Sequence, residues 1–266
     1  MLTGHQTDVM YVFLNNVGME LYFISALLGV LGLSVGSFIS AVTYRIPRGI
    51  GFVLGRSFCD RCKKELKWYD NLPLISFLLY CGASRCCEAK ISIRYPLIEI
   101  SSLLGAIVLF YFFPFYQFVL YYVLFVILLV ILVIDLEHQI IPDELTWLVL
   151  ALGLFMVHGS LIAVLFPAFL FALLLLTLYL ITSGKGMGLG DVKLAIPLGL
   201  ILGLELGIYW LVTSFILGGI VASVLLILKR ANLKTKIAFG PFLIVGFWII
   251  ILMDRLNILE KLNLMA

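Results

Sequence analysis

The sequence predicts an all-α polytopic membrane protein with about eight transmembrane helices and a small cytoplasmic loop domain that contains cysteines. Of its 266 residues, 63% are hydrophobic and only 12% are charged, and the mean hydropathy is +1.17. Soluble domains average about 45–50% apolar and about 25% charged residues. The composition therefore excludes an ordinary soluble protein, and no sequence motif indicates that the chain binds nucleic acid.

Eight apolar runs are the expected membrane helices, and each is close to the roughly 20 residues that cross the hydrocarbon core of a bilayer. The sixth run is short and contains Pro197, Gly199 and Gly203. The expected helices cover residues 19–43, 96–113, 117–136, 144–160, 162–182, 191–205, 207–228 and 238–253.

The basic residues predict the orientation of these helices. If the N-terminus lies outside the cytoplasm, sixteen of the 18 Lys and Arg residues fall on the cytoplasmic side, most of them in the loop 45–95. Cytoplasmic loops of membrane proteins are enriched in Lys and Arg, so this orientation is strongly favoured. Asp135 and Asp191 then both lie at cytoplasmic ends of membrane helices.

Asp135 and Asp191 are the two candidate catalytic residues. Asp135 follows a long apolar run, and Asp191 begins another one. An ionisable residue at membrane depth is costly and commonly faces a cavity, a partner or a reaction, although an acid near a helix end can also simply mark the water interface. Two carboxylates held close together do not both ionise easily, so one keeps a proton and the pair can act as acid and base on a water molecule. Hydrolysis of a peptide bond needs this division of roles.

Residues close to the two acids are expected to support the site. Gly188 and Gly190 leave room for a peptide or another backbone to approach, because they have no Cβ. Lys193 is expected either beside the acids, where it would tune them, or as an anchor at the cytoplasmic surface. Asp143 begins an expected helix, where acids are favoured by the helix dipole, and is the reserve candidate for the role of Asp135.

Five cysteines in the polar loop indicate a metal site. Cys59 and Cys62 form a C-x2-C pair, and Cys81, Cys86 and Cys87 follow about 20 residues later. Two pairs at this separation are typical of tetrahedral zinc, while a disulfide or free thiols are the competing interpretations. The predicted cytoplasmic location disfavours a disulfide. The expected ligands are Cys59, Cys62, Cys81 and Cys87, with Cys86 as the alternative to Cys81.

A set of short motifs follows in a fixed order between residues 29 and 246. The motifs are Gly36–Phe38, Tyr44–Gly49, Cys59–Cys62, Trp68–Pro73, Ile91–Glu99, Ile134–His138 with Pro142–Asp143, Gly188–Lys193 and Phe239–Phe242. The Gly-x-Gly-Asp motif alone would be a weak signal, but the whole set in this order is specific. It resembles the bacterial type IV prepilin peptidases, a family of membrane aspartic proteases.

The resemblance implies an activity and its catalytic residues. Members of this family remove the short basic leader from prepilins and pseudopilins at the cytoplasmic face of the bacterial inner membrane. Their two catalytic aspartates match Asp135 and Asp191, and proteolysis needs no cofactor. Many members also methylate the new N-terminus with S-adenosylmethionine, an activity tied to the N-terminal half, where Arg94, Tyr95 and Glu99 match the family pattern.

The resemblance also implies three regions. Residues 1–18 form an extracytoplasmic segment, residues 19–95 form the first span with the cysteine loop, and residues 96–266 form the peptidase domain in the lipid bilayer. In one departure from the family pattern, Ser84 stands where the first cysteine of the second pair is usual. Family members without the cysteines exist, so a structural Zn²⁺ is not required for proteolysis.

A transporter is the alternative function. In that case Asp135 and Asp191 would relay protons or cations between helices that are interrupted by Gly and Pro. A transporter predicts ion flux across a vesicle membrane, whereas a peptidase predicts loss of a prepilin leader.

Overall fold

The computed structural model describes residues 4–51, 57–59, 61–157, 159–184, 186–230, 235 and 237–258. The description includes side chains except for those of residues 4–23 and residue 161. Several basic residues of the predicted charge pattern lie outside the described residues, namely Arg56, Lys185, Lys234, Lys236 and Lys261. The chain divides into two compact units, Met1–Phe118 and Val119–Ala266, which are described separately below.

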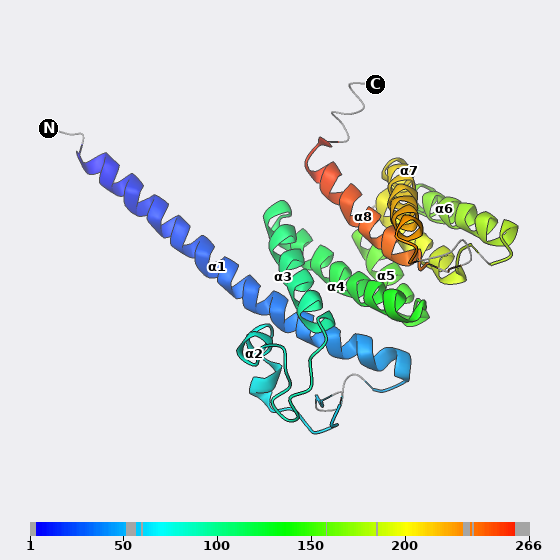
Figure 1. The fold of residues 1–266 in the computed structure, drawn as a ribbon. Coiled ribbons are helices and arrows are strands. Elements are labelled where there is room, and N and C mark those ends of the chain that lie inside the picture. Colours follow the sequence, from blue (N-terminus) through cyan, green and yellow to red (C-terminus); the bar gives the residue numbers. More distant parts are fainter. Residues whose placement is uncertain are drawn as a thin grey trace. The chain divides into compact units, whose positions relative to one another are not determined.

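The N-terminal unit consists of two long helices joined by a polar loop that contains short helical segments (Figure 1). Its helices are α1 (Gly4–Arg45), η1 (Ile46–Arg48), η2 (Trp68–Asn71), α2 (Ile75–Leu79) and α3 (Arg94–Phe112). In the described part of the loop, two isolated antiparallel bridges join Phe58 to Glu65 and Ala83 to Lys90. The loop is therefore held by turns rather than by a sheet.

Small residues bring α1 and α3 into close contact. Gly32 and Gly36 have the G-x-x-x-G spacing that lets membrane helices approach each other closely. A Cβ at Gly32 would lie 2.8 Å from Cα of Leu103, and a Cβ at Gly36 would lie 2.6 Å from Cα of Glu99. The contact between backbones fixes the position of Glu99 relative to the C-terminal end of α1.

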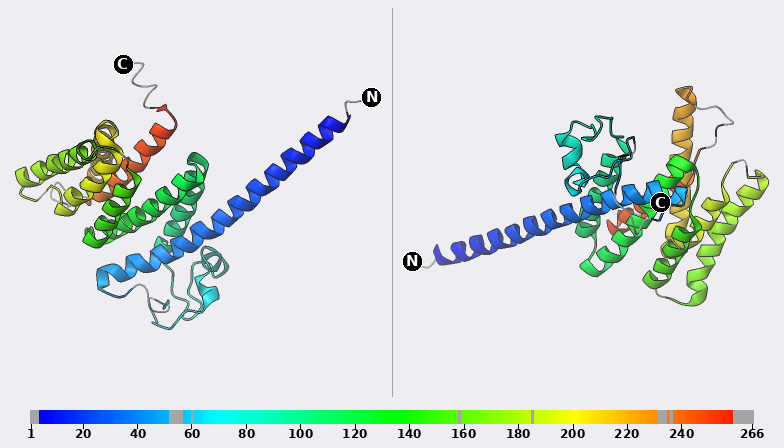
Figure 2. Two further views of the ribbon diagram at one scale, coloured as in Figure 1. Left: turned by 180° about the vertical axis from the view of Figure 1, so that it is seen from behind. Right: turned by 90° about the horizontal axis from the view of Figure 1, so that it is seen from below.

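The C-terminal unit is an all-helical bundle in which α7 contacts α5, α6 and α8 (Figure 2). The helices are α4 (Phe115–His138), which enters the unit at Val119, α5 (Asp143–Met156), α6 (Leu161–Ile181), α7 (Leu189–Ile227) and α8 (Gly240–Arg255). Glycines again mark the close contacts. A Cβ at Gly199 of α7 would lie 2.9 Å from the ring of Phe171 in α6, and a Cβ at Gly153 of α5 would lie 3.0 Å from Ile201 of α7.

A kink at Gly203 divides α7 into two helical segments. Gly203 has a φ of 71° and a ψ of −169°, a backbone conformation that residues with a Cβ rarely adopt. The kink accounts for the sequence pattern, which predicts two helices at 191–205 and 207–228. The break lies two residues before the end of the first expected helix.

The fold class is confirmed, and each of the eight expected spans falls on helix. In the described part of the chain, five helices are long and apolar enough to cross a membrane, namely α1 from Ile24 on, α3, α4, α6 and α7. The number differs from eight because α7 is one kinked helix, and because α5 and α8 have only 14 and 16 residues.

One helix boundary differs from that expected. Helix α1 begins at Gly4 rather than near residue 19. The two compact units divide after Phe118. Helix α3 belongs to the N-terminal unit because it packs along α1.

Candidate active site and metal centre

Asp135 lies on the buried face of α4. Leu124, Leu128 and Ile131 are fully buried, and their helical spacing continues to Asp135 one turn later. The carboxylate of Asp135 is buried with only 4% of the residue exposed, and its Oδ2 has no hydrogen-bond partner among the described residues. A buried polar atom without a partner is costly, so this oxygen marks a place for a bound molecule or a reaction.

Asp191 lies in the first turn of α7 and is also buried, at 5% exposure. Its Oδ2 accepts a hydrogen bond from the backbone N–H of Gly188 at 3.1 Å. A carboxylate at this position normally stabilises the start of a helix, which is the structural role available to Asp191. The buried residues Ala195 and Leu198 follow at helical spacing, so Asp191 faces the interior of the bundle rather than solvent.

The two carboxylates converge at the first residue of α8. The backbone N–H of Gly240 faces both of them, and the charge of Asp135 acts on Asp191. A Cβ at Gly240 would lie 2.5 Å from Oδ2 of Asp135 and 3.1 Å from Cδ1 of Ile141. The fold therefore joins two acids from separate helices into one buried site, with a glycine backbone against them.

Gly188 and Gly190 have different surroundings. A Cβ at Gly190 would lie 3.0 Å from Cβ of Ile141, so the space expected beside this glycine is filled by the loop between α4 and α5. A Cβ at Gly188 would meet Oδ2 of Asp191 at 3.5 Å, an ordinary contact distance. Gly188 supports the site through its N–H, whereas Gly190 supports it by letting Ile141 approach.

Asp143 and Lys193 form an ion pair beside the site. Both carboxylate oxygens of Asp143 lie 2.8 Å from Nζ of Lys193, and about half of each side chain is exposed. Lys193 therefore links the N-terminal ends of α5 and α7. Asp143, the reserve candidate, is held by this exposed pair, while Asp135 has the buried position that an acid pair requires.

Gly240 is a site residue for which the sequence gives no chemical role. It has no side chain to titrate, and only the surrounding Phe-Gly-Pro-Phe motif singles it out. Its place at the start of α8, against both carboxylates, depends on how three helices pack and is visible only in the tertiary structure.

Four of the five cysteines in the N-terminal unit form a cluster. The sulfur atoms of Cys59, Cys62, Cys86 and Cys87 all lie within 4.8 Å of one another. The Sγ atoms of Cys62 and Cys86 are 3.0 Å apart, and those of Cys59 and Cys87 are 3.7 Å apart. Four sulfurs bound to tetrahedral zinc at about 2.3 Å lie about 3.8 Å from one another. The donor set and its dimensions therefore fit zinc.

Two turns with the same hydrogen-bond pattern hold the cluster. In each turn, the first residue donates its N–H to the carbonyl five residues later and accepts from the N–H four residues later. The first turn begins at Cys59 and the second at Ser84. The fifth residue of each turn has a positive φ, 57° at Lys63 and 55° at Glu88. The second turn repeats the first, with Ser84 in the place of Cys59.

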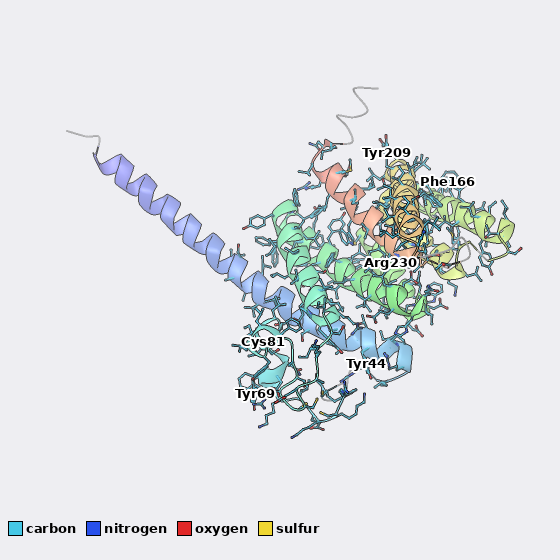
Figure 3. All side chains as sticks on the ribbon, in the orientation of Figure 1. Tyr44, Tyr69, Cys81, Phe166, Tyr209 and Arg230 are labelled. Atoms are coloured by element: carbon cyan, nitrogen blue, oxygen red, sulfur yellow. The ribbon has the colours of Figure 1, made fainter. Side chains whose placement is uncertain are left out.

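The predicted ligand Cys81 lies outside this cluster, and the alternative ligand Cys86 takes its place. Cys81 follows α2 and precedes the second turn (Figure 3). The turn that begins at Ser84 brings Cys86 and Cys87 toward the first pair, and the Sγ of Cys86 lies 3.2 Å from the hydroxyl of Ser84. Cys86 thus contributes a sulfur atom to the cluster, where Ser84 contributes none.

Hydrogen bonds around the thiol of Cys59 favour its ionised form. Its burial opposes the charged form, but the backbone of Cys62, the hydroxyl of Ser84 and the backbone of Arg61 stabilise the thiolate. Together these hydrogen bonds lower the pKa of Cys59 to about 6. Because the thiolate is the form that binds a metal, the first turn supports the interpretation as a metal centre.

Comparisons with known proteins find a family and relatives that cover most of the chain. A family model described as Bacterial Peptidase A24 N-terminal domain matches residues 30–113, and one described as Type IV leader peptidase family matches residues 122–223. A protein from Stutzerimonas stutzeri named "Prepilin leader peptidase/N-methyltransferase" is 33% identical over 255 residues, which cover 84% of this chain and 88% of that protein. A protein of the same name from Pseudomonas putida is 32% identical over 262 residues, with coverages of 87% and 91%. No solved structure matches the chain.

The two family matches correspond to the two structural units. The first match covers the paired helices and the cysteine cluster, and the second covers the helices that carry both buried acids. The extent of the matches, together with relatives above 30% identity over most of the chain, leads to one conclusion. The chain belongs to the type IV leader peptidase family.

Proposed function

We propose that this chain removes the leader from prepilins and related precursors, with Asp135 and Asp191 as the catalytic acids. The observation that carries the proposal is the convergence of these two buried carboxylates at the N–H of Gly240. Buried paired carboxylates are the arrangement with which aspartic proteases divide one proton between an acid and a base. Family membership favours this function over the transporter alternative.

The reaction follows from that division of roles. One carboxylate takes a proton from a water molecule while the water oxygen attacks the carbonyl carbon of the scissile peptide bond. The other acid gives its proton to the carbonyl oxygen. The carbon–nitrogen bond then breaks as the leaving amine takes up the proton held by the first carboxyl group. One hydroxyl of the intermediate returns its proton to the second carboxylate, so both acids regain their starting forms. General acid–base catalysis of this kind contributes about 10²–10⁴-fold to the rate.

The distribution of basic residues supports a cytoplasmic location for the site. In the orientation favoured by Lys and Arg, Asp135 and Asp191 lie at the cytoplasmic ends of α4 and α7, in the bacterial inner membrane. A precursor with an apolar helix in the bilayer and a basic leader in the cytoplasm would present its cleavage point at this depth. The proposed partners are therefore the precursor and the surrounding lipid.

A second proposed activity is methylation of the new N-terminus, as the names of the curated relatives suggest. S-adenosylmethionine, when bound, would supply the methyl group that the neutral amine nitrogen accepts. The proton lost from the amine goes to water. Zinc in the cluster of Cys59, Cys62, Cys86 and Cys87 would have a structural role, because four cysteines leave no open position on the metal.

Co-expression with a prepilin tests the proposed peptidase. We expect the wild type to reduce the precursor mass by that of its leader, and a further gain of one methyl group reports the second activity. Asp135→Asn and Asp191→Asn should each abolish cleavage, because Asn cannot exchange the proton. Asp143→Asn is the matched control and should retain cleavage. Cleavage that persists in both Asp135→Asn and Asp191→Asn would disprove the proposed acid pair.

A further inference from the structure

The short helix α2 (Ile75–Leu79) lies in the polar loop between α1 and α3 (Figure 1). Three of its five residues are large aliphatic ones that point outward, since Ile75, Leu78 and Leu79 are 52%, 73% and 70% exposed. A helix on a water-facing surface exposes polar side chains instead. These three side chains form an apolar face that the described part of the chain leaves open.

The hydroxyl groups near α2 lie on its other side, around a cavity of about 300 Å³ in the N-terminal unit. Ser76 and Tyr80 line this cavity, and Glu99 of α3 lies in its wall. Ser76 also donates its hydroxyl to the carbonyl of Leu72 at 2.8 Å, so this polar group is satisfied within the protein. The segment turns hydroxyls inward and aliphatic groups outward, which is the distribution expected beside lipid rather than water.

A hydrogen bond to α3 fixes the depth of α2 in the membrane. The N–H of Leu74, the residue before α2, donates to Oε2 of Glu99 at 2.8 Å. Helix α3 is long and apolar enough to span the membrane and begins at Arg94, so Glu99 lies about 7.5 Å farther along the helix axis. Leu97 and Ile100, on either side of Glu99 in the sequence, are exposed apolar residues. The start of α2 therefore lies at a depth where α3 presents apolar side chains to lipid.

The segment before α2 adds aromatic and basic side chains that are typical of a membrane interface. Trp68 is 77% exposed and belongs to η2, which contacts α2. Lys67 and Arg85 both place their cations over the ring of Tyr69, at 5.7 and 4.6 Å from its centroid. Arg85 also pairs with Asp70 at 3.1 Å, so Lys67 is the cation to which we assign a ligand. Trp and Tyr are enriched at the level of lipid headgroups, and basic residues near a membrane surface attract anionic lipids.

We propose that residues 67–79 form an interfacial anchor that lies in the cytoplasmic leaflet and binds anionic phospholipid. The aliphatic side chains of α2 lie among acyl chains, Trp68 lies at the boundary with the headgroups, and Lys67 contacts a phosphate group. Interfacial helices bury their apolar face about 5–10 Å into this boundary, which agrees with the position of Glu99 along α3. Residues 45–95 contain ten Lys and Arg but only four Asp and Glu, so the loop complements an anionic surface.

The apolar helix of a precursor is the other candidate for this face. Lipid is favoured because the face is short. Helix α2 has five residues and is about 7.5 Å long, whereas a precursor helix that crosses the bilayer has about 20 residues and is about 30 Å long. The inference requires insertion into the membrane but does not rest on the proposed peptidase activity.

Photocrosslinking of the full chain in nanodiscs of equimolar phosphatidylglycerol and phosphatidylcholine tests the proposal. The photoreactive residue p-benzoylphenylalanine replaces Leu78 on the outer side of α2. Leu79→p-benzoylphenylalanine is a second variant with the same expected result. Tyr80→p-benzoylphenylalanine is the matched control, because Tyr80 lines the cavity on the inner side. Gel filtration shows which variants are folded, and the mass of the illuminated protein identifies each adduct.

We expect lipid adducts at Leu78 and Leu79 and none at Tyr80. Phosphatidylglycerol should exceed phosphatidylcholine about fivefold among these adducts, the effect of one cation near an anionic surface. Lys67→Gln, introduced into the Leu78 variant, should lower this enrichment at least about threefold. Lys229→Gln should leave it unchanged, because this exposed lysine lies in the other unit.

Three results would overturn the proposal. Absence of lipid adducts at both Leu78 and Leu79 would show that the apolar face of α2 does not lie in the bilayer. Equal amounts of the two lipids would show that the anchor does not select anionic lipid. If addition of a prepilin to the same nanodiscs replaced the lipid adducts with prepilin adducts, the face would be a docking site for the precursor.

Discussion

Gly240 and Asp135 are in such close contact that a Cβ on the glycine would lie 2.5 Å from Oδ2 of the carboxylate. Real Cβ atoms do not approach an oxygen this closely, so any other residue at this position must displace the acid. The start of α8 therefore fixes where one half of the acid pair can lie, although it contributes only backbone.

The first prediction concerns this contact. Gly240→Ala should move the carboxylate of Asp135 and reduce prepilin cleavage about 100-fold, the effect expected of a displacement of about 1 Å in a catalytic group. Gly219→Ala is the control, because a Cβ at Gly219 meets no described atom within 4 Å. Cleavage is followed by mass spectrometry of the precursor in membranes. Wild-type cleavage by Gly240→Ala would show that the catalytic geometry does not depend on this contact.

The second prediction identifies the fourth metal ligand. Cys86→Ser should lose zinc, whereas Cys81→Ser should retain it, as measured by metal analysis of the purified protein. The repeated turn allows a rescue experiment, because Ser84 stands where the first turn has Cys59. We expect the double variant Ser84→Cys, Cys86→Ser to bind zinc again. Loss of zinc from Cys81→Ser would instead restore Cys81 as a ligand.

The third prediction concerns the ion pair beside the acids. Lys193→Met should lower the free energy of unfolding by no more than about 1 kcal/mol, because exposed ion pairs contribute little. Cleavage by this variant should stay within about threefold of the wild type, since Nζ of Lys193 binds Asp143 rather than the acid pair. A loss of cleavage as complete as that of Asp191→Asn would assign Lys193 a direct catalytic role.

The fourth prediction concerns the packing of α1 on α3. A Cβ at Gly36 would lie 2.6 Å from Cα of Glu99, a backbone atom that cannot move aside. Gly36→Ala should therefore destabilise the N-terminal unit by about 1–3 kcal/mol, the usual cost of overpacking. Gly29→Ala is the matched control, because its nearest contact would be 3.8 Å from a leucine side chain. Thermal unfolding in nanodiscs should show a lower Tm for Gly36→Ala alone.

Several features could be predicted from the sequence because they depend on local patterns. Apolar runs predict membrane helices wherever they occur, and all of the expected spans fall on helix. The short run that contains Pro197, Gly199 and Gly203 lies in the kinked helix α7. The burial of Asp135 follows from its place after an apolar stretch, because α4 continues its buried face to this residue.

Other features depend on contacts between distant segments. The sequence favours Cys81 as a metal ligand with Cys86 as the alternative, and only the turn that begins at Ser84 brings Cys86 to the other sulfurs. Likewise, only the structure shows that Nζ of Lys193 contacts Asp143. The cavity beside Glu99 combines residues from α1, the loop and α3, so no single stretch of sequence indicates it.

The sequence by itself determined that this protein is a helical membrane protein with two acids at helix ends and a loop with five candidate sulfur ligands. Only the tertiary structure decided that these acids lie together in one buried site against Gly240. It also decided which cysteines form the cluster, namely Cys59, Cys62, Cys86 and Cys87. The physical reason is that burial and helix formation depend on the periodicity of neighbouring residues. The meeting of distant side chains depends instead on how closely helices pack, and here single glycines set that distance.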